Sequence, residues 1–371
     1  MLILHQTIYY SYSQLKTTLL YSQTDILSMR EKLPLKKYAE LYPRLEEVAL
    51  KDINILENKK GITLTLTSSL KNLKYFIYKI NENNIKKTTS TITLEFSEKT
   101  DTPQHYEIKI KAVTDTKETE FKKIKIGFYP REFYAKRGRT VEASWIIIEE
   151  TEIPYMPTSV EEWATYDVGE EDKKIISEKW GYLVKNVDNI YTAAKNIAKS
   201  IIKELEPHRG IPSDAMEDLN PLKQYFRAVN GEDKVWCSNI AEIYSYICCA
   251  LNIPCRTIIV RNLLYRDEEK GLLLSPAHTT TEVFCRDLNK WIWIDPTQYT
   301  LGVLDSEENP LNLIELYWYL SYLKDYSRLK IIEYDVKEDK EKIILFKESQ
   351  RAKSVLYYFG RDQVFEYTRK Q

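Results

Sequence analysis

Residues 235–256 read VWCSNIAEIYSYICCALNIPCR and hold four of the five cysteines in a chain of 371 residues. Apolar residues recur along this stretch at the spacing of one broad helix face: Ile240, Ile243, Tyr244, Ile247, Ala250 and Leu251. The turn-forming residues NGEDK precede it at 230–234. Pro254 cannot continue a helix and disfavours helical backbone in the residue before it. The pattern predicts a buried helix that starts near Cys237 and stops at the residues NIP.

Three of these four cysteines are expected to be packing residues. Cys248 and Cys249 fall in the last turns of the predicted helix, and Cys255 leads into the apolar run TIIV. Buried free cysteine behaves as a small apolar side chain. The spacing lacks the C-x2-C pairs of a tetrahedral zinc site, and adjacent helical residues point about 100° apart, which disfavours a disulfide. We therefore expect no metal site and no cofactor.

Cys237 differs from the other cysteines because it starts the predicted helix. The first backbone N–H groups of a helix are unpaired and its dipole is positive there, which favours thiolate over thiol. The same N–H groups can receive an oxyanion. A nucleophilic cysteine also requires a base within reach and a group that orients this base.

The candidate base is His278, and its candidate partner is Asp295. The segments HTTTEVF and KWIWID form two predicted strands joined by the polar turn RDLN at 286–289, so His278 and Asp295 should lie side by side in a hairpin. A carboxylate on one imidazole nitrogen fixes the tautomer and leaves the other nitrogen to take a thiol proton. Surface or structural roles are expected for the remaining histidines: His5, His105 and His208.

The composition indicates a soluble globular protein of two or three domains. Lys and Arg total 54 against 55 Asp and Glu, so no basic excess points to a nucleic-acid partner. No run approaches the roughly 18 apolar residues of a membrane span. The first 20 residues lack the basic start and apolar core of a signal peptide. The sequence therefore leaves two locations open: the cytoplasm, or export with a signal peptide that has been removed.

The first half of the chain is predicted to be rich in β-structure. Apolar and polar residues alternate, as in half-buried strands, at residues 62–67, 91–96, 106–113 and 123–129. The segments 73–80 and 141–148 are richer in apolar residues, as in central strands. Short strands at near-regular spacing indicate an antiparallel sandwich, which we predict to be Ig-like over residues 51–150. Residues 1–50 are an N-terminal segment without an assigned architecture, and residues 152–159 are a predicted linker.

Helical spacing dominates after the predicted linker. Residues 187–205 form an amphipathic helix for which Asp188 is the expected N-cap. Residues 311–326 form another predicted helix, and the tail contributes strand-like segments at 329–336, 342–346 and 354–359. The order of elements indicates an α+β core at 160–325 attached to the β module, with residues 326–371 as a C-terminal extension that packs on this core.

Taken together, four motifs resemble the transglutaminase-like superfamily, which contains animal transglutaminases and many bacterial papain-like proteins. They are the helix-start cysteine, NIPCR, H-x3-EV and W-x-W-x-D-P-T, all within residues 235–297, with looser similarity over 185–325. Asn252 stands where the family usually has glycine, and Cys255 takes the small-residue position before Arg256. The resemblance is to a bacterial-type member carrying an N-terminal β-sandwich.

This resemblance implies a papain-like core with a Cys-His-Asp triad of Cys237, His278 and Asp295, which performs acyl transfer through a thioester. Arg256 would be structural or line the cleft, as would Trp293. Trp236 would shield the site or pack in the core, and we prefer the second interpretation. No side chain matches an oxyanion donor, so backbone groups including the Cys237 N–H would serve, and no acidic cluster typical of a calcium site is present.

Amide or peptide hydrolysis is the expected reaction, ahead of transamidation. The expected substrate is a protein or peptide, including a glycan-linked or cell-wall-linked peptide. Arylamine acetyl transfer ranks lower because the pattern around Cys237 fits it less well. The alternative from another class is a non-catalytic binding or assembly protein that retains the fold and uses its sandwich to hold a partner or a glycan.

Overall fold

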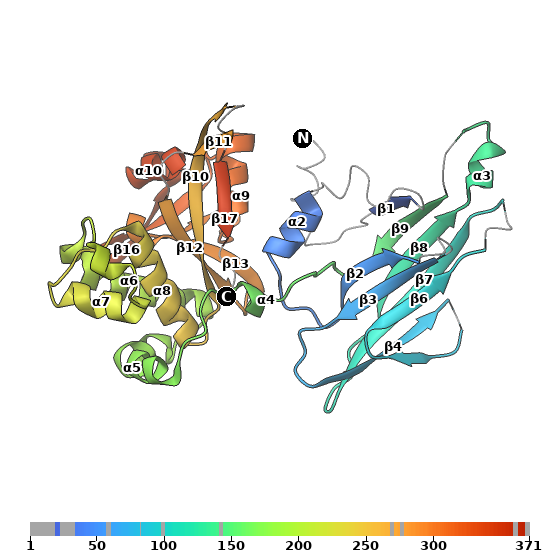
Figure 1. Ribbon diagram of the computed structural model, residues 1–371, viewed down its shortest axis with the longest axis horizontal. Coiled ribbons are helices and arrows are strands. Elements are labelled where there is room, and N and C mark those ends of the chain that lie inside the picture. Colours follow the sequence, from blue (N-terminus) through green and yellow to red (C-terminus); the bar gives the residue numbers. More distant parts are fainter. Residues whose placement is uncertain are drawn as a thin grey trace. The chain divides into compact units, whose positions relative to one another are not determined.

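Two units make up the chain, Met1–Ser159 and Val160–Gln371 (Figure 1). The computed structural model describes residues 19–22, 34–56, 61–81, 83–97, 101–140, 144–267, 271–274, 278–358 and 363–367. The chain is a mixed α+β protein, and its named strands pair in antiparallel fashion within four sheets. Among the described residues, no helix combines the length and hydropathy that crossing a membrane would require.

The first unit contains a six-stranded sheet in the order β1-β9-β8-β7-β4-β5 and a three-stranded sheet in the order β2-β3-β6. Its elements are β1 (Leu19–Ser22), α2 (Pro34–Leu41), β2 (Ala49–Ile55), β3 (Gly61–Thr67), β4 (Leu73–Ile80), β5 (Lys86–Thr88), β6 (Thr91–Glu95), β7 (Gln104–Thr114), β8 (Lys122–Tyr129), α3 (Arg131–Ala135) and β9 (Trp145–Thr151). Alternate side chains of both sheets, among them Leu64 and Ile110, form one apolar core. The strands predicted at 62–67, 73–80, 91–96, 106–113 and 123–129 are confirmed.

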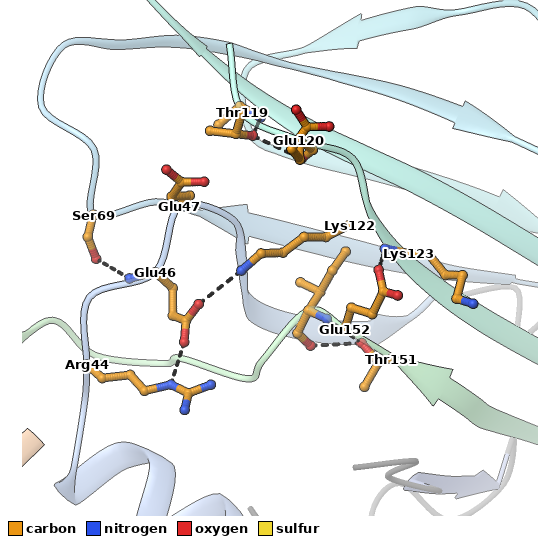
Figure 2. Close-up of polar contacts among 12 residues, drawn as sticks. Arg44, Glu46, Glu47, Ser69, Thr119, Glu120, Lys122, Lys123, Thr151 and Glu152 are labelled. Atoms are coloured by element: carbon orange, nitrogen blue, oxygen red, sulfur yellow. Dashed lines mark hydrogen bonds and ion pairs between the residues drawn. The ribbon is translucent and has the colours of Figure 1, made fainter. Parts of the chain in front are cut away.

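An ion-pair network joins connecting segments of the first unit to β8 (Figure 2). The Glu46 carboxylate lies 2.5 Å from Arg44 Nε and 3.1 Å from Lys122 Nζ. The backbone N–H of Glu46 donates to Ser69 Oγ at 3.0 Å, which ties the segment before β2 to the β3–β4 connection. Glu46 is largely buried and has two cationic partners, so we assign this network a structural role.

The second unit is built on β10, β12 and β13. Its helices are α4 (Val160–Trp163), α5 (Glu170–Trp180), α6 (Ile190–Leu205), α7 (Pro221–Val229), α8 (Cys237–Ala250), α9 (Leu313–Tyr317) and α10 (Arg351–Tyr358). Its strands are β10 (Cys255–Asp267), β11 (Gly271–Leu274), β12 (His278–Cys285), β13 (Lys290–Ile294), β14 (Thr300–Leu304), β15 (Lys330–Asp335), β16 (Lys340–Leu345) and β17 (Gln363–Tyr367). Short helical turns complete it: η1 (Gly181–Val184), η2 (Glu206–His208), η3 (Asp214–Met216), η4 (Pro296–Gln298), η5 (Trp318–Leu323) and η6 (Phe346–Glu348).

Helix α8 is the centre of this unit. It contacts β10 and β12 on one side and α5, α6 and α7 on others (Figure 1). Because the helix is enclosed in this way, Ile240, Ile243, Tyr244 and Ile247 are each at most 1% exposed. The packing fixes the N-terminus of α8 near the start of β12, which is where the predicted nucleophile and base lie.

The structure corrects the predicted N-cap of α6. Asn189, rather than Asp188, is the capping residue, because its side chain accepts a hydrogen bond from the Thr192 N–H at 2.8 Å. Asparagine and aspartate have similar N-cap preferences, so two adjacent candidates are not distinguished by sequence.

The strand predicted at 354–359 is also wrong, because residues 351–358 form helix α10. Ser349 Oγ accepts hydrogen bonds from the N–H groups of Arg351 and Ala352 at 3.0 and 3.1 Å, which satisfies two donors at the helix start. Ala352 and Val355, three residues apart, are both buried against the core. A cap together with i,i+3 burial favours a helix here despite the β-branched and aromatic residues.

Candidate functional site

Cys237 is the first residue of α8, and the helix start is held by buried amides. Trp236 is the N-cap residue with extended backbone, and its N–H donates to Asn239 Oδ1 at 3.2 Å. The Asn239 side chain in turn donates to Gln224 Oε1 of α7 at 2.9 Å. Since Asn239 and Gln224 are both buried, they fix the backbone that carries the Cys237 thiol.

His278 and Asp295 lie side by side in the β12–β13 hairpin. The register pairs Thr281 with Ile294, so the start of β12 lies beside the residue that follows β13. The distance from His278 Nε2 to Asp295 Oδ2 is 2.6 Å, and the two residues are 2% and 1% exposed. The predicted hairpin is therefore confirmed.

The Asp295 carboxylate is oriented by the turn η4 that follows it. Its Oδ1 accepts the Gln298 N–H at 3.2 Å, while Oδ2 contacts His278. Its backbone N–H and carbonyl bond to Thr300 at 2.9 and 3.0 Å. With both oxygens and both backbone groups engaged, the carboxylate has one orientation toward the imidazole.

The Cys237 thiol is partly buried and has a pKa below its ordinary value. Burial acts in the opposite direction, since it favours the neutral thiol. A hydrogen bond between the thiol and His278, a hydrogen bond from the Thr279 backbone and the charge of His278 together outweigh burial. These contacts favour a thiolate at Cys237.

The pKa of His278 changes in the opposite direction to that of Cys237. Burial alone would lower the pKa of its imidazole, but the charge and hydrogen bond of Asp295, with a smaller contribution from Cys237, raise the pKa to about 10. The histidine is therefore protonated at neutral pH, and the site favours a thiolate–imidazolium pair.

This pair gives the stability of the protein a characteristic pH dependence. A histidine with a pKa of about 10 when folded and about 6.5 when unfolded contributes stability that is complete below pH 6.5 and is lost as pH rises through 10. The lowered pKa of Cys237 adds stability as pH rises to about 8.5, the pKa of the unfolded thiol, and this gain offsets the loss from His278. Between about pH 8.5 and 10, the wild type should therefore lose roughly 1 kcal/mol per pH unit more than the double variant His278→Gln/Cys237→Ala, which lacks both groups. Urea unfolding of both proteins across this range measures the difference, and equal slopes would contradict the assigned ionisation.

The other three residues singled out from the sequence have different environments. Trp236 is 49% exposed and its indole N–H donates to Ser238 Oγ at 2.9 Å, so the preferred core position was wrong. Trp293 is buried, and its indole N–H donates to Thr280 Oγ1 at 2.7 Å. Arg256 is fully buried and lies 2.7 Å from Glu282. Neither Arg256 nor Trp293 is exposed to a cleft.

Sequence reasoning missed two residues around this site. Glu282 belongs to the H-x3-EV motif, yet its role as the partner of Arg256 was not assigned. Arg209 lies in the loop after α6, and its guanidinium donates to the carbonyl of Thr297 at 2.8 Å. Motif spacing could have suggested the first contact, whereas no local pattern indicates the second.

Metal-binding geometry is not found at this site. In the part of the chain that the structure describes, no group of three or more His, Cys, Asp or Glu side chains could hold a metal ion. The five cysteines, all within the described ranges, are free thiols: Cys237, Cys248, Cys249, Cys255 and Cys285. Burial raises the pKa of Cys249 to about 12, so its thiol stays neutral where that of Cys237 ionises.

Comparison by structure finds similarity to a cysteine protease and to a transglutaminase, both at low TM-scores. One is a candidate cysteine protease from Cytophaga hutchinsonii, 12% identical, with 69% of this chain and 73% of that chain covered at a TM-score of 0.24. Another is the transglutaminase of red sea bream, 11% identical, with 93% of this chain and 67% of that chain covered at a TM-score of 0.25. No family model and no curated protein matches the sequence. At such low TM-scores, the chemistry has to be inferred from this chain's own residues.

Proposed function

We propose that the protein is a thiol acyl-transfer enzyme that acts on amide or peptide bonds, with Cys237 as nucleophile, His278 as acid and base, and Asp295 as the group that orients the base. The observation that carries this proposal is the 2.6 Å contact from Asp295 Oδ2 to His278 Nε2. This contact leaves the other imidazole nitrogen for the Cys237 thiol, with which His278 is hydrogen-bonded.

In the proposed reaction, the Cys237 thiolate attacks the substrate carbonyl carbon and the carbonyl π pair moves to oxygen. The N–H groups at the start of α8 are suited to stabilise that oxyanion. His278 donates its proton to the leaving amine as the C–N bond breaks, which gives a thioester and a neutral imidazole. The imidazole then takes a proton from water, the resulting hydroxide attacks the thioester, and the carboxylic acid and the thiolate are released.

We propose hydrolysis ahead of transamidation, because water needs no binding site of its own and an amine acceptor does. The substrate proposed is a protein or peptide, including a glycan-linked or cell-wall-linked peptide. We also propose that residues 51–150 are an Ig-like sandwich, that 160–325 are the catalytic core and that 326–371 extend it. A non-catalytic protein with the same fold is the alternative, and an unreactive Cys237 would favour it.

The proposal predicts that iodoacetamide at pH 6 alkylates Cys237 at least about tenfold faster in the folded protein than in the protein unfolded in urea. The reason is that folding lowers the pKa of the Cys237 thiol. Cys249 is the internal control, since it is also partly exposed but has a raised pKa. Peptide mapping after timed labelling gives both rates in one experiment.

Folding that slows the alkylation of Cys237, or leaves its rate unchanged, would rule out an activated nucleophile. A positive result is extended by incubating the protein with mixed peptides and hydroxylamine. Peptide hydroxamates are then expected with the wild type and absent with Cys237→Ala, since hydroxylamine intercepts a thioester.

A further inference from the structure

We infer that Arg209 is a positioning residue, which holds the turn after Asp295 in register with the segment that leads to Cys237. This inference rests on the proposed function and adds a determinant of the geometry between its nucleophile and its base. Arg209 precedes both segments in the chain: its side chain donates to the turn, and its chain neighbours His208 and Gly210 are hydrogen-bonded to Val235.

The guanidinium of Arg209 binds the turn that orients Asp295. It donates from Nη1 to the Thr297 carbonyl at 2.8 Å and from Nη2 to the Pro296 carbonyl at 3.3 Å. These are the first two carbonyls after Asp295, and the same turn supplies the Gln298 N–H to the Asp295 carboxylate. A planar guanidinium bound to two successive carbonyls restricts both the position and the tilt of the turn.

The backbone on either side of Arg209 is joined to the segment before the nucleophile. Arg209 and Val235 form a parallel bridge, in which the Gly210 N–H donates to the Val235 carbonyl at 3.0 Å and the Val235 N–H donates to the His208 carbonyl at 2.9 Å. Val235 is fully buried and lies two residues before Cys237. Residues 208–210 therefore join the two segments whose spacing determines how the thiol meets the imidazole: the Arg209 side chain binds one, and the backbone of His208 and Gly210 binds the other.

Neighbouring side chains hold the guanidinium in this position. Arg209 Nε lies 2.9 Å from Glu206 Oε2, and the guanidinium carbon lies 4.2 Å from the centre of the Tyr299 ring. The Tyr299 hydroxyl donates to the same Glu206 carboxylate. Arg351, from the C-terminal part of the chain, donates to the Gln298 carbonyl at 3.0 Å, but no contact described for it reaches the segment before Cys237. Arg209, unlike Arg351, thus binds the turn from a segment that is itself bonded to Val235.

The test is the pH dependence of Cys237 alkylation by iodoacetamide in Arg209→Gln and Arg209→Lys. If the turn is released, the contact from Asp295 to His278 loosens, the imidazolium is less stabilised and the thiolate forms at higher pH. We expect the midpoint of the alkylation profile to rise by about one pH unit in Arg209→Gln, with a rate about tenfold lower at pH values well below the midpoint. Lysine cannot bind two carbonyls in one plane, so Arg209→Lys should show a smaller shift in the same direction.

Arg137→Gln is the matched control. Arg137 also donates to a carbonyl, that of Phe133 at 2.9 Å, and stacks on the Phe133 ring, but it belongs to the first unit. The variant Arg137→Gln should leave the pH midpoint of Cys237 alkylation unchanged.

The outcomes separate the two claims. If Arg209 has a purely structural role, its substitution lowers the urea midpoint of unfolding but leaves the pH midpoint of Cys237 alkylation unchanged. This result in a folded variant overturns the inference, while the proposed function stands. A wild type whose Cys237 reacts slowly overturns both. If Arg209→Gln does not fold, Arg209→Lys is judged by the same criterion.

Discussion

His278→Gln is expected to lower the rate constant for alkylation of Cys237 at pH 6 by about two orders of magnitude. The contact with His278 is the first cause that lowers the pKa of Cys237, and it opposes the effect of burial. Without it, the thiol pKa returns to about 8.5 or above, and less than about 1% is thiolate at pH 6. Glutamine retains polarity and a side-chain donor for Asp295, so the change removes chiefly the imidazolium. Rates from pH 5 to 10 would show the wild-type plateau replaced by a single alkaline rise.

His105→Gln is a matched control for this experiment. His105 also has a carboxylate partner, Glu149, with Nδ1 at 3.0 Å from its nearer oxygen, but the pair is exposed and lies in the first unit. The control should alkylate as the wild type does. If His278→Gln and His105→Gln react equally fast at pH 6, His278 does not activate the thiol.

Arg256→Met is expected to cost roughly 3–5 kcal/mol of unfolding free energy, because it leaves the Glu282 carboxylate buried without its cation. Both side chains are 0% exposed. Arg256 donates from Nε and Nη2 to Glu282 Oε2 at 3.0 and 2.7 Å, and the other oxygen accepts the Leu313 N–H at the start of α9 at 2.6 Å. The guanidinium carbon also lies 4.1 Å from the centre of the Trp291 ring, which adds a cation–π contact.

Urea unfolding monitored by tryptophan fluorescence reports on the affected unit, because all the tryptophans except Trp145 lie in Val160–Gln371. Arg256→Met combined with Glu282→Leu should cost less than Arg256→Met alone, since no buried charge remains. Lys330→Met is the control: it breaks a partly exposed pair with Glu308 and should change stability by no more than about 1 kcal/mol. A similar small cost for Arg256→Met would show that the buried pair does not stabilise the unit.

Local sequence predicted the elements that carry the candidate site. Apolar spacing and Pro254 bound α8, and the turn at 286–289 set the hairpin that brings His278 to Asp295. Both features depend on residues close in sequence, where hydrogen-bond periodicity and turn chemistry act directly. The same local reasoning failed for α10 and for the cap of α6. The Ser349 hydroxyl caps α10, and the Asn189 side-chain amide caps α6.

The sequence by itself thus determined where the thiol, the imidazole and the carboxylate lie on their own elements. Only the tertiary structure decided that Trp236 is exposed while Arg256 is buried, and that Arg209 binds the turn after Asp295. Those outcomes depend on contacts between separate segments of the chain: Arg256 and Glu282 are 26 residues apart, and Arg209 and Thr297 are 88 apart. Periodicity within a segment indicates which face is apolar, but the partner of a polar group is selected by the packing of the whole unit.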